Sequence, residues 1–373
     1  MKYPRPIRKG DILGVTAPSS GVTDPLDLVR MQHGVDALVA RGYAVLQTPN
    51  VFTNDDQGRS SPAEQKVEEF NSLLENPDVS CIFSAKGGDW QYEMLPLVDW
   101  SLWESNPKWF QGYSDNTVLG FKATAEHDVA TMYAGNFGDF GMDPWHISIT
   151  DDIEVLEGTR DRVSSYEFHE DGFHDRVTGL ETVSDDSRTW WKTSYCDERF
   201  SGRLLGGCMD VLEWFCLKDT ADPSRFIESY GGEGIVWFME TYSMDAARIG
   251  RMFKAMREKG WLKDASGFIF GRPLMFGGEF AFDEDSYIDS VMDAIADLEA
   301  PAVFDADVGH KAPRMPFVNG ARADVSVSSG ACEIRYSFKR CPIRMRKRPN
   351  RTEYHPIRSL TYNRMRMDGR CSG

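Results

Sequence analysis

The chain has 373 residues, of which 41% are hydrophobic and 27% are charged, which is long enough for two packed domains and too apolar for a disordered protein. The net charge of −16 is uneven: residues 339–373 carry 11 Lys and Arg against two acidic side chains, a net of +9 that leaves −25 for residues 1–338. An acidic body repels phosphate, so we expect no nucleic-acid partner. We interpret 339–373 as a disordered basic tail, with a basic interaction arm as the alternative.

No apolar run approaches the length of a membrane span, and the apolar stretch at 12–15 is too short for the core of a signal peptide. We therefore predict a cytoplasmic protein with no membrane partner. The seven cysteines are scattered and form no Cys-x-x-Cys pair, which indicates reduced thiols rather than a disulfide framework or a zinc knuckle.

The first part of the chain alternates strands and helices. Apolar runs predict strands at 12–17, 43–48, 79–84 and 108–111. Helices are predicted after Asp24-Pro25 and after the apparent capping box Ser61-Pro62-Ala63-Glu64. This alternation predicts a parallel sheet covered on both faces, with ligands at the carboxyl ends of its strands.

Periodicity fades in residues 146–189, where Asp, Glu, Ser and Thr dominate, and we interpret this segment as a linker or loop region. It then returns, with helices predicted near 211–215, 245–259 and 287–298, and strands predicted at 234–239, 267–270, 302–304 and 323–328. We therefore predict an α/β protein with an N-terminal domain at 1–145 and a second α/β domain at 190–338.

A serine stands where the strand predicted at 108–111 ends. Gly112-Tyr113-Ser114-Asp115 leads directly into a helical pattern, which would hold Ser114 at the tip of a sharp elbow beside backbone N–H groups. This is a suitable place for a nucleophile. An ordinary strand-to-helix turn, with Ser114 or Asp115 as the N-cap, is the alternative.

Two further predicted strand ends carry the residue types that a serine nucleophile needs. Glu240 follows the apolar strand at 234–239, and His310 follows Asp307-Val308-Gly309. A serine hydroxyl needs a base to take its proton, and the base works best when a carboxylate fixes its tautomer. Ser114, His310 and Glu240 would fill these roles, although a surface strand end would explain Glu240 equally well.

Backbone donors for an oxyanion are expected at Gly88 and Asp115. Gly87 and Gly88 follow the strand at 79–84, where backbone without side chains approaches a ligand closely, and Asp115 follows the proposed nucleophile. A tight turn would explain the glycine pair as well. The adjacent Trp190 and Trp191 would form a stacking platform for a planar ligand or pack against a domain surface.

Two short clusters offer metal-ligand residue types, namely Asp305-x-Asp307-x-x-His310 and His169-Glu170-Asp171-x-x-His174. Neither matches a dedicated motif such as His-Glu-x-x-His, so we predict that no metal and no organic cofactor is needed. A metal-dependent hydrolase and a non-catalytic ligand-binding protein remain the alternatives to a serine hydrolase.

The order and spacing of these segments resemble the LD-carboxypeptidase family of serine peptidases, which includes muramoyl-tetrapeptide carboxypeptidases and microcin C self-immunity proteins. Matching text runs from GDILGVTAPSSG through KGGDWQYEMLPLVDW, NPKWFQGYSDNTVL, GRLLGGCMDVL, FMETYSMD and GFIFGRP to DADVGHKAPRMPFVNGARADV. The resemblance implies an N-terminal flavodoxin-like domain, a C-terminal domain of the family's own type and a homodimer. It also implies that Ser114 is the nucleophile, His310 the base and Glu240 the residue that orients it.

The sequence departs from the family pattern in ways that concern the substrate. Lys86, with Gly87 and Gly88, stands where many peptidoglycan-recycling members have an arginine before paired glycines. The insertion at 145–200 is more similar to the self-immunity branch, whose aromatic loop residues stack on a nucleotide. We predict a serine hydrolase that cleaves an amide bond in a murein tetrapeptide or in a peptidyl-nucleotide.

Overall fold

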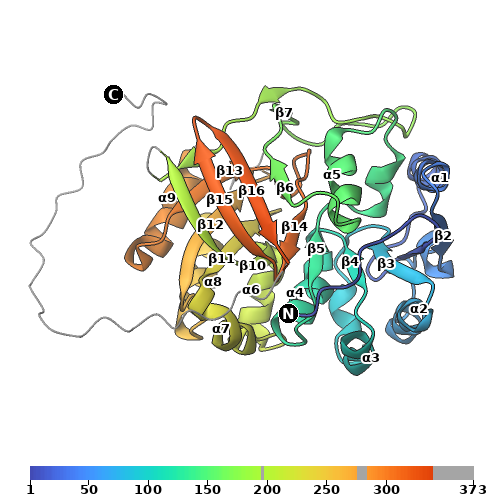
Figure 1. Cartoon of the computed structure of the whole chain (residues 1–373), viewed down its shortest axis with the longest axis horizontal. Helices are drawn as coiled ribbons and strands as arrows, with labels where there is room; N and C mark the ends of the chain where they lie inside the picture. Colours follow the sequence, from blue (N-terminus) through green and yellow to red (C-terminus); the bar gives the residue numbers. More distant parts are fainter. Residues whose placement is uncertain (195–196, 275–283, 339–373) are drawn as a thin grey trace, which may run out of the picture.

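The computed structural model describes residues 1–194, 197–274 and 284–338, and its two large sheets lie side by side (Figure 1). The predicted tail at 339–373 lies outside the described residues. The described cysteines Cys81, Cys208, Cys216 and Cys332 are free thiols. Within the described residues, no helix has both the length and the apolarity required to cross a membrane.

The N-terminal sheet has the order β14-β5-β4-β3-β1-β2. Its strands are β1 (Ile12–Thr16), β2 (Ala44–Gln47), β3 (Val79–Ser84), β4 (Trp109–Gln111), β5 (Thr131–Tyr133) and β14 (Phe317–Asn319). Strands β1 to β5 are parallel and follow the 2-1-3-4-5 order of flavodoxin-like folds, and β14 adds antiparallel to β5. This pairing confirms the predicted parallel sheet, and β3 and β4 are buried along their whole length, as strands covered on both faces must be.

Helices cover this sheet where the sequence provides start signals and apolar faces (Figure 1). They are α1 (Pro25–Ala40), α2 (Ala63–Glu75), α3 (Trp100–Ser105), α4 (Thr117–Ala125) and α5 (Ile147–Leu156). Asp24 caps α1 as predicted, since its side chain accepts from the N–H groups of Leu26 and Asp27. The capping box predicted for α2 is wrong: Pro62 is the N-cap, and the buried Ser61 hydroxyl has no hydrogen-bond partner among the described residues.

The second sheet has the order β6-β16-β15-β10-β11-β12-β13-β9. Its strands are β6 (Arg162–Ser164), β9 (Lys192–Thr193), β10 (Glu198–Cys208), β11 (Ile235–Glu240), β12 (Ala265–Gly271), β13 (Ala302–Ala306), β15 (Arg322–Ser328) and β16 (Ala331–Ser337). Strands β10 to β13 are parallel, and the outer strands pair antiparallel. The accompanying helices are α6 (Met209–Lys218), α7 (Ser224–Tyr230), α8 (Ala246–Glu258) and α9 (Glu284–Ile295).

The segment 146–189 has regular structure that its composition did not indicate. Helix α5 begins after His146, and β6 pairs with β16 at the edge of the second sheet. A separate two-stranded sheet joins β7 (Phe168–His169) and β8 (Ser187–Arg188). The domain limits at 145 and 190 stay predictions.

The chain crosses between the two sheets just after β13. Residues 307–316 leave the second sheet, and β14 then pairs with β5 of the first sheet. The Asn319 side chain accepts from the N–H of Gly206 in β10 at 3.0 Å, which ties β14 to the second sheet as well. The carboxyl ends of β4 and β11 therefore lie near each other where the two sheets meet.

Candidate active site

Ser114 occupies a strained elbow immediately after β4. Its φ is +65°, in the left-handed region that non-glycine residues rarely adopt. Gly112 makes the turn possible, because a Cβ there would lie 2.8 Å from Cγ of Asn116. A short 3₁₀ turn, η3 (Ser114–Asn116), then leads directly into α4. This is the sharp strand-to-helix turn that the sequence predicts.

The structure brings together the three side chains that the sequence singled out. Oγ of Ser114 lies 2.9 Å from Nε2 of His310, across 196 residues of sequence. Nδ1 of His310 lies 2.8 Å from Oε2 of Glu240. Glu240 ends β11 and is 0% exposed, and His310 lies in the crossing segment and is 5% exposed. The arrangement has the geometry of a nucleophile, a base and a carboxylate that orients the base.

The backbone of Gly309 permits the close approach of Glu240 to His310. Gly309 has φ +113°, and a Cβ at this position would lie 2.8 Å from both Cβ and Oε2 of Glu240. Any side chain would therefore displace the carboxylate. Glycine at this position is a requirement of the site.

Tyr133, at the end of β5, was missed by the sequence analysis. Its hydroxyl accepts the N–H of Ser114 at 2.9 Å and donates to Oε1 of Glu240 at 2.5 Å. The pKa of this phenol lies well above its ordinary value, because burial disfavours the phenolate and the charge of Glu240 repels it. The only sequence signal was a tyrosine on a three-residue strand, which is too short to be predicted from periodicity.

The glycine pair after β3 lies beside the nucleophile. A Cβ on Gly87 would lie 3.3 Å from Oγ of Ser114, so the bare backbone of this turn faces the hydroxyl. Gly88 has φ +147°, and a side chain there would collide with Ser19 and Ser20. The oxyanion roles of the Gly88 and Asp115 N–H groups stay predictions.

The Asp115 side chain turns inward, away from any role as an N-cap. Its carboxylate accepts from Ser19 Oγ at 2.5 Å and from the N–H of Gln91 at 2.9 Å. Burial raises the pKa of this carboxyl to about 6, and the two hydrogen bonds oppose that rise. The elbow is thus bound to the neighbouring loops by the residue that follows the serine.

Aromatic rings and a partly buried arginine hold the His310 segment. The rings of Tyr113 and Tyr242 lie 5.3 Å and 4.7 Å from the imidazole, and Tyr242 is 39% exposed. Arg314 lies 4.1 Å from the centre of the Tyr113 ring and donates to the carbonyls of Gly309 and His310. These bonds fix the backbone that carries the imidazole.

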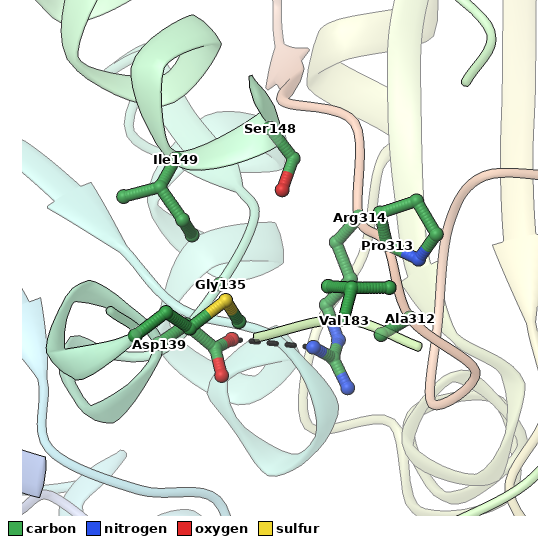
Figure 2. A pocket seen from close by; sticks show the side chains of 9 residues that line it. Gly135, Asp139, Ser148, Ile149, Val183, Ala312, Pro313 and Arg314 are labelled. Atoms are coloured by element: carbon green, nitrogen blue, oxygen red, sulfur yellow. Dashed lines mark hydrogen bonds and ion pairs between the residues drawn. The ribbon is translucent and has the colours of Figure 1, made fainter. Parts of the chain in front are cut away.

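Figure 2 shows the ion pair of Arg314 with Asp139, whose atoms lie 3.2 Å apart, at the wall of a pocket. The pocket lies between α5 and the segment 312–314, and Ser148, Ile149 and Val183 complete much of its lining. None of the three proposed catalytic side chains lines this pocket. We therefore assign it no part in binding the reacting bond.

Of the two alternatives for the adjacent tryptophans, the stacking platform made by both rings does not form. Trp191 is 1% exposed, and its indole donates to Oδ2 of Asp307 at 3.1 Å. A buried ring has no free face for a ligand, so the binding role predicted for Trp191 is wrong. Trp190 is 51% exposed and packs against the backbone of Gly330.

The residues considered as metal ligands have other partners. Asp307 forms a buried ion pair with Arg272, and its second oxygen accepts from the N–H of Tyr166. His169 contacts Thr189, and His174 pairs with Asp186. Over residues 1–194, 197–274 and 284–338, no three His, Cys, Asp or Glu side chains are grouped to hold a metal ion.

Both halves of the chain match domain models of the same protein family. The LD-carboxypeptidase N-terminal domain matches residues 13–134, and the LD-carboxypeptidase C-terminal domain matches residues 201–325. The microcin C7 self-immunity protein MccF of Escherichia coli is 26% identical over 283 residues, covering 73% of this chain and 78% of that protein. A probable murein peptide carboxypeptidase of Bacillus subtilis is 22% identical over 335 residues, covering 89% and 93%.

Solved structures show the same fold. MccF in complex with aspartyl sulfamoyl adenosine superposes with a TM-score of 0.74 at 21% identity and covers 91% of this chain and 99% of that chain. Muramoyltetrapeptide carboxypeptidase from Oxalobacter formigenes superposes with a TM-score of 0.64 at 19% identity, covering 87% and 98%.

Proposed function

The chain belongs to the LD-carboxypeptidase family, and on that premise we propose that it is a serine peptidase that hydrolyses an amide bond through Ser114, His310 and Glu240. The observation that carries the proposal is the continuous hydrogen-bond chain from Oγ of Ser114 through the imidazole to a fully buried carboxylate. A buried carboxylate is costly unless it is paired, and here its partner is the base itself.

The geometry supports a two-step reaction. Nε2 of His310 takes the proton from Ser114 as Oγ attacks the carbonyl, and Glu240 stabilises the imidazolium. The N–H groups of Gly88 and Asp115 hold the oxyanion. His310 then protonates the leaving amine, which departs and leaves an acyl-enzyme. Water, activated by the same imidazole, attacks the ester and releases the acid and the free serine.

We propose a peptidyl-nucleotide or aminoacyl-nucleotide as the first candidate substrate. The support is the likeness to MccF, whose solved complexes include aspartyl sulfamoyl adenosine and whose TM-score exceeds that of the muramoyltetrapeptide carboxypeptidase. Trp190, with one ring face exposed, is the aromatic residue that we assign to a nucleobase. A murein tetrapeptide is the second candidate, favoured by the carboxypeptidase match over 89% of the chain. A homodimer, as the family resemblance implies, belongs to the same proposal.

The experiment compares wild type with Ser114→Ala on both substrate classes, with products identified by mass spectrometry. Loss of a triad serine lowers the rate by about a million-fold in a well-studied protease, so cleavage should vanish. Ser105→Ala, at the exposed end of α3, is the matched control and should keep full activity.

The outcomes separate the alternatives. Cleavage of one class that disappears in Ser114→Ala supports the mechanism and identifies the substrate. Cleavage that survives in the variant refutes the nucleophile, and cleavage that stops with a chelator in the wild type indicates the metal hydrolase. Tight binding of either class without turnover indicates the binding protein.

A further inference from the structure

We propose that Tyr133 is a positioning residue that holds both ends of the catalytic hydrogen-bond chain through a single hydroxyl. This inference rests on the proposed function and deepens it. Tyr133 ends β5, the neighbour of β4 in the N-terminal sheet, and is 3% exposed. Its ring lies 5.6 Å from that of Phe238 in β11, the strand that ends in Glu240.

Four hydrogen bonds close a circuit through this phenol. The N–H of Ser114 reaches the Tyr133 oxygen at 2.9 Å, and the phenol reaches Oε1 of Glu240 at 2.5 Å. Oε2 of Glu240 contacts Nδ1 of His310, whose Nε2 contacts Oγ of Ser114. The circuit therefore begins at the backbone of the nucleophile and returns to its side chain. Displacement of any member moves the others.

The donors and acceptors fix the direction of this circuit. A backbone N–H only donates, so the Tyr133 oxygen accepts from Ser114 and its single proton points to Oε1 of Glu240. Oε2 is then the oxygen left to accept from Nδ1 of His310. With the proton on Nδ1, Nε2 has its lone pair directed at the serine hydroxyl, which is the tautomer that a general base needs.

The same hydroxyl stabilises the strained elbow. Ser114 holds φ +65°, and its N–H is satisfied by Tyr133 rather than left unpaired. This N–H is consequently not a donor for an oxyanion. The role falls to the N–H groups of Gly88 and Asp115, as the sequence predicts.

The test is Tyr133→Phe, which removes only the hydroxyl. Its loss leaves the Ser114 N–H and one oxygen of Glu240 without a partner, so we expect kcat to fall by about 10- to 100-fold with KM unchanged. The rate at which a fluorophosphonate labels Ser114 should fall in parallel, which gives a readout that needs no natural substrate. Tyr43→Phe is the matched control, because Tyr43 is buried and donates to Glu157 beside the start of β2, and it should keep wild-type rates.

A double variant distinguishes positioning from general support of the fold. In the Glu240→Gln background the imidazole already carries its proton on the wrong nitrogen, so orienting the side chain at position 240 no longer helps the base, and adding Tyr133→Phe should cause less than a twofold further loss. Losses that multiply would overturn the inference, as would wild-type kcat and labelling in Tyr133→Phe. If instead the wild type is neither labelled nor active, or Ser114→Ala retains activity, the proposed function fails first, and these arms show it separately.

Discussion

Glu240→Gln tests the site most directly, because it keeps the shape of the side chain and removes its charge. The buried carboxylate accepts from Tyr133 through one oxygen and pairs with His310 through the other. An amide has only one oxygen. If that oxygen keeps the proton of Tyr133, the NH2 group faces Nδ1, and the imidazole must carry its proton on Nε2, facing Ser114. The base then has no lone pair for the serine hydroxyl.

The magnitude follows from this change of tautomer. The corresponding acid-to-amide substitution in a known serine protease lowers kcat by about 10⁴, and we expect a loss of about 10³ to 10⁴ here. The assay is steady-state kcat and KM on the cleaved substrate, with thermal unfolding as the check on folding. The control is Glu198→Gln. Glu198 is a buried carboxylate at the start of β10, whereas the other end of this strand, at Cys208, pairs with Glu240, so the control should keep the wild-type rate. A loss below about tenfold in a folded Glu240→Gln protein would refute the reasoning.

Three further substitutions test separate parts of the structure. Gly309→Ala places a Cβ 2.8 Å from Glu240 at φ +113°, so kcat/KM should fall by about 100-fold, and kinetics within twofold of wild type would contradict this. Trp191→Ala should lower the free energy of unfolding, measured in urea, by about 3 to 5 kcal/mol, because this ring is buried. Trp190→Ala should leave the free energy of unfolding nearly unchanged and raise KM only for a nucleotide substrate. Equal effects of the two substitutions on stability and on KM would count against both assignments. Burial raises the pKa of Asp115 to about 6. Between about pH 4 and pH 6 the folded protein therefore keeps a proton on this carboxyl that the unfolded chain has lost, and the free energy of unfolding should fall as the pH rises through this range. Asp115→Asn should flatten that slope in urea midpoints measured across this range, and an unchanged slope would show that another group causes it.

The candidate site residues could be predicted from the sequence where a single local segment indicates both a buried strand and a reactive side chain at its end. Strands β4 and β11 are buried along their whole length and consist mainly of apolar residues, and the residues that end or follow such strands were the natural candidates for a site at the carboxyl edge of a parallel sheet. Ser114 and Glu240 were identifiable for this reason. His310 was identifiable from its residue type near a predicted strand end and from the family resemblance, and the hydrogen bonds of the structure connect all three.

Elements stabilised by distant partners could not be predicted in the same way. Helix α5 contains Asp151 and Asp152, which read as a solvated segment and are instead buried. Asp151 accepts from Tyr166, and Asp152 accepts from the Gln111 side chain in β4. Burial raises the pKa of both carboxyls, the cost that these bonds partly offset. Strand β5 is short and polar-started, so Tyr133 carried no signal before the fold was known.

The wrong binding role of Trp191 and the rejected metal role of Asp307 have one physical explanation. Trp191 resembled part of a ligand platform and Asp307 resembled a metal ligand, yet the indole of Trp191 donates to the carboxylate of Asp307. A fully buried carboxylate requires several donors, and Arg272 and the N–H of Tyr166 supply the others. Asp307 therefore ties three remote segments to the start of the loop that carries His310, only three residues away. Trp191 and Asp307 are partners of each other, and no local sequence pattern reveals such a pairing. The contacts of Asp307 hold the loop in place, and the imidazole of His310 can therefore contact Glu240 of the second sheet and Ser114 of the first.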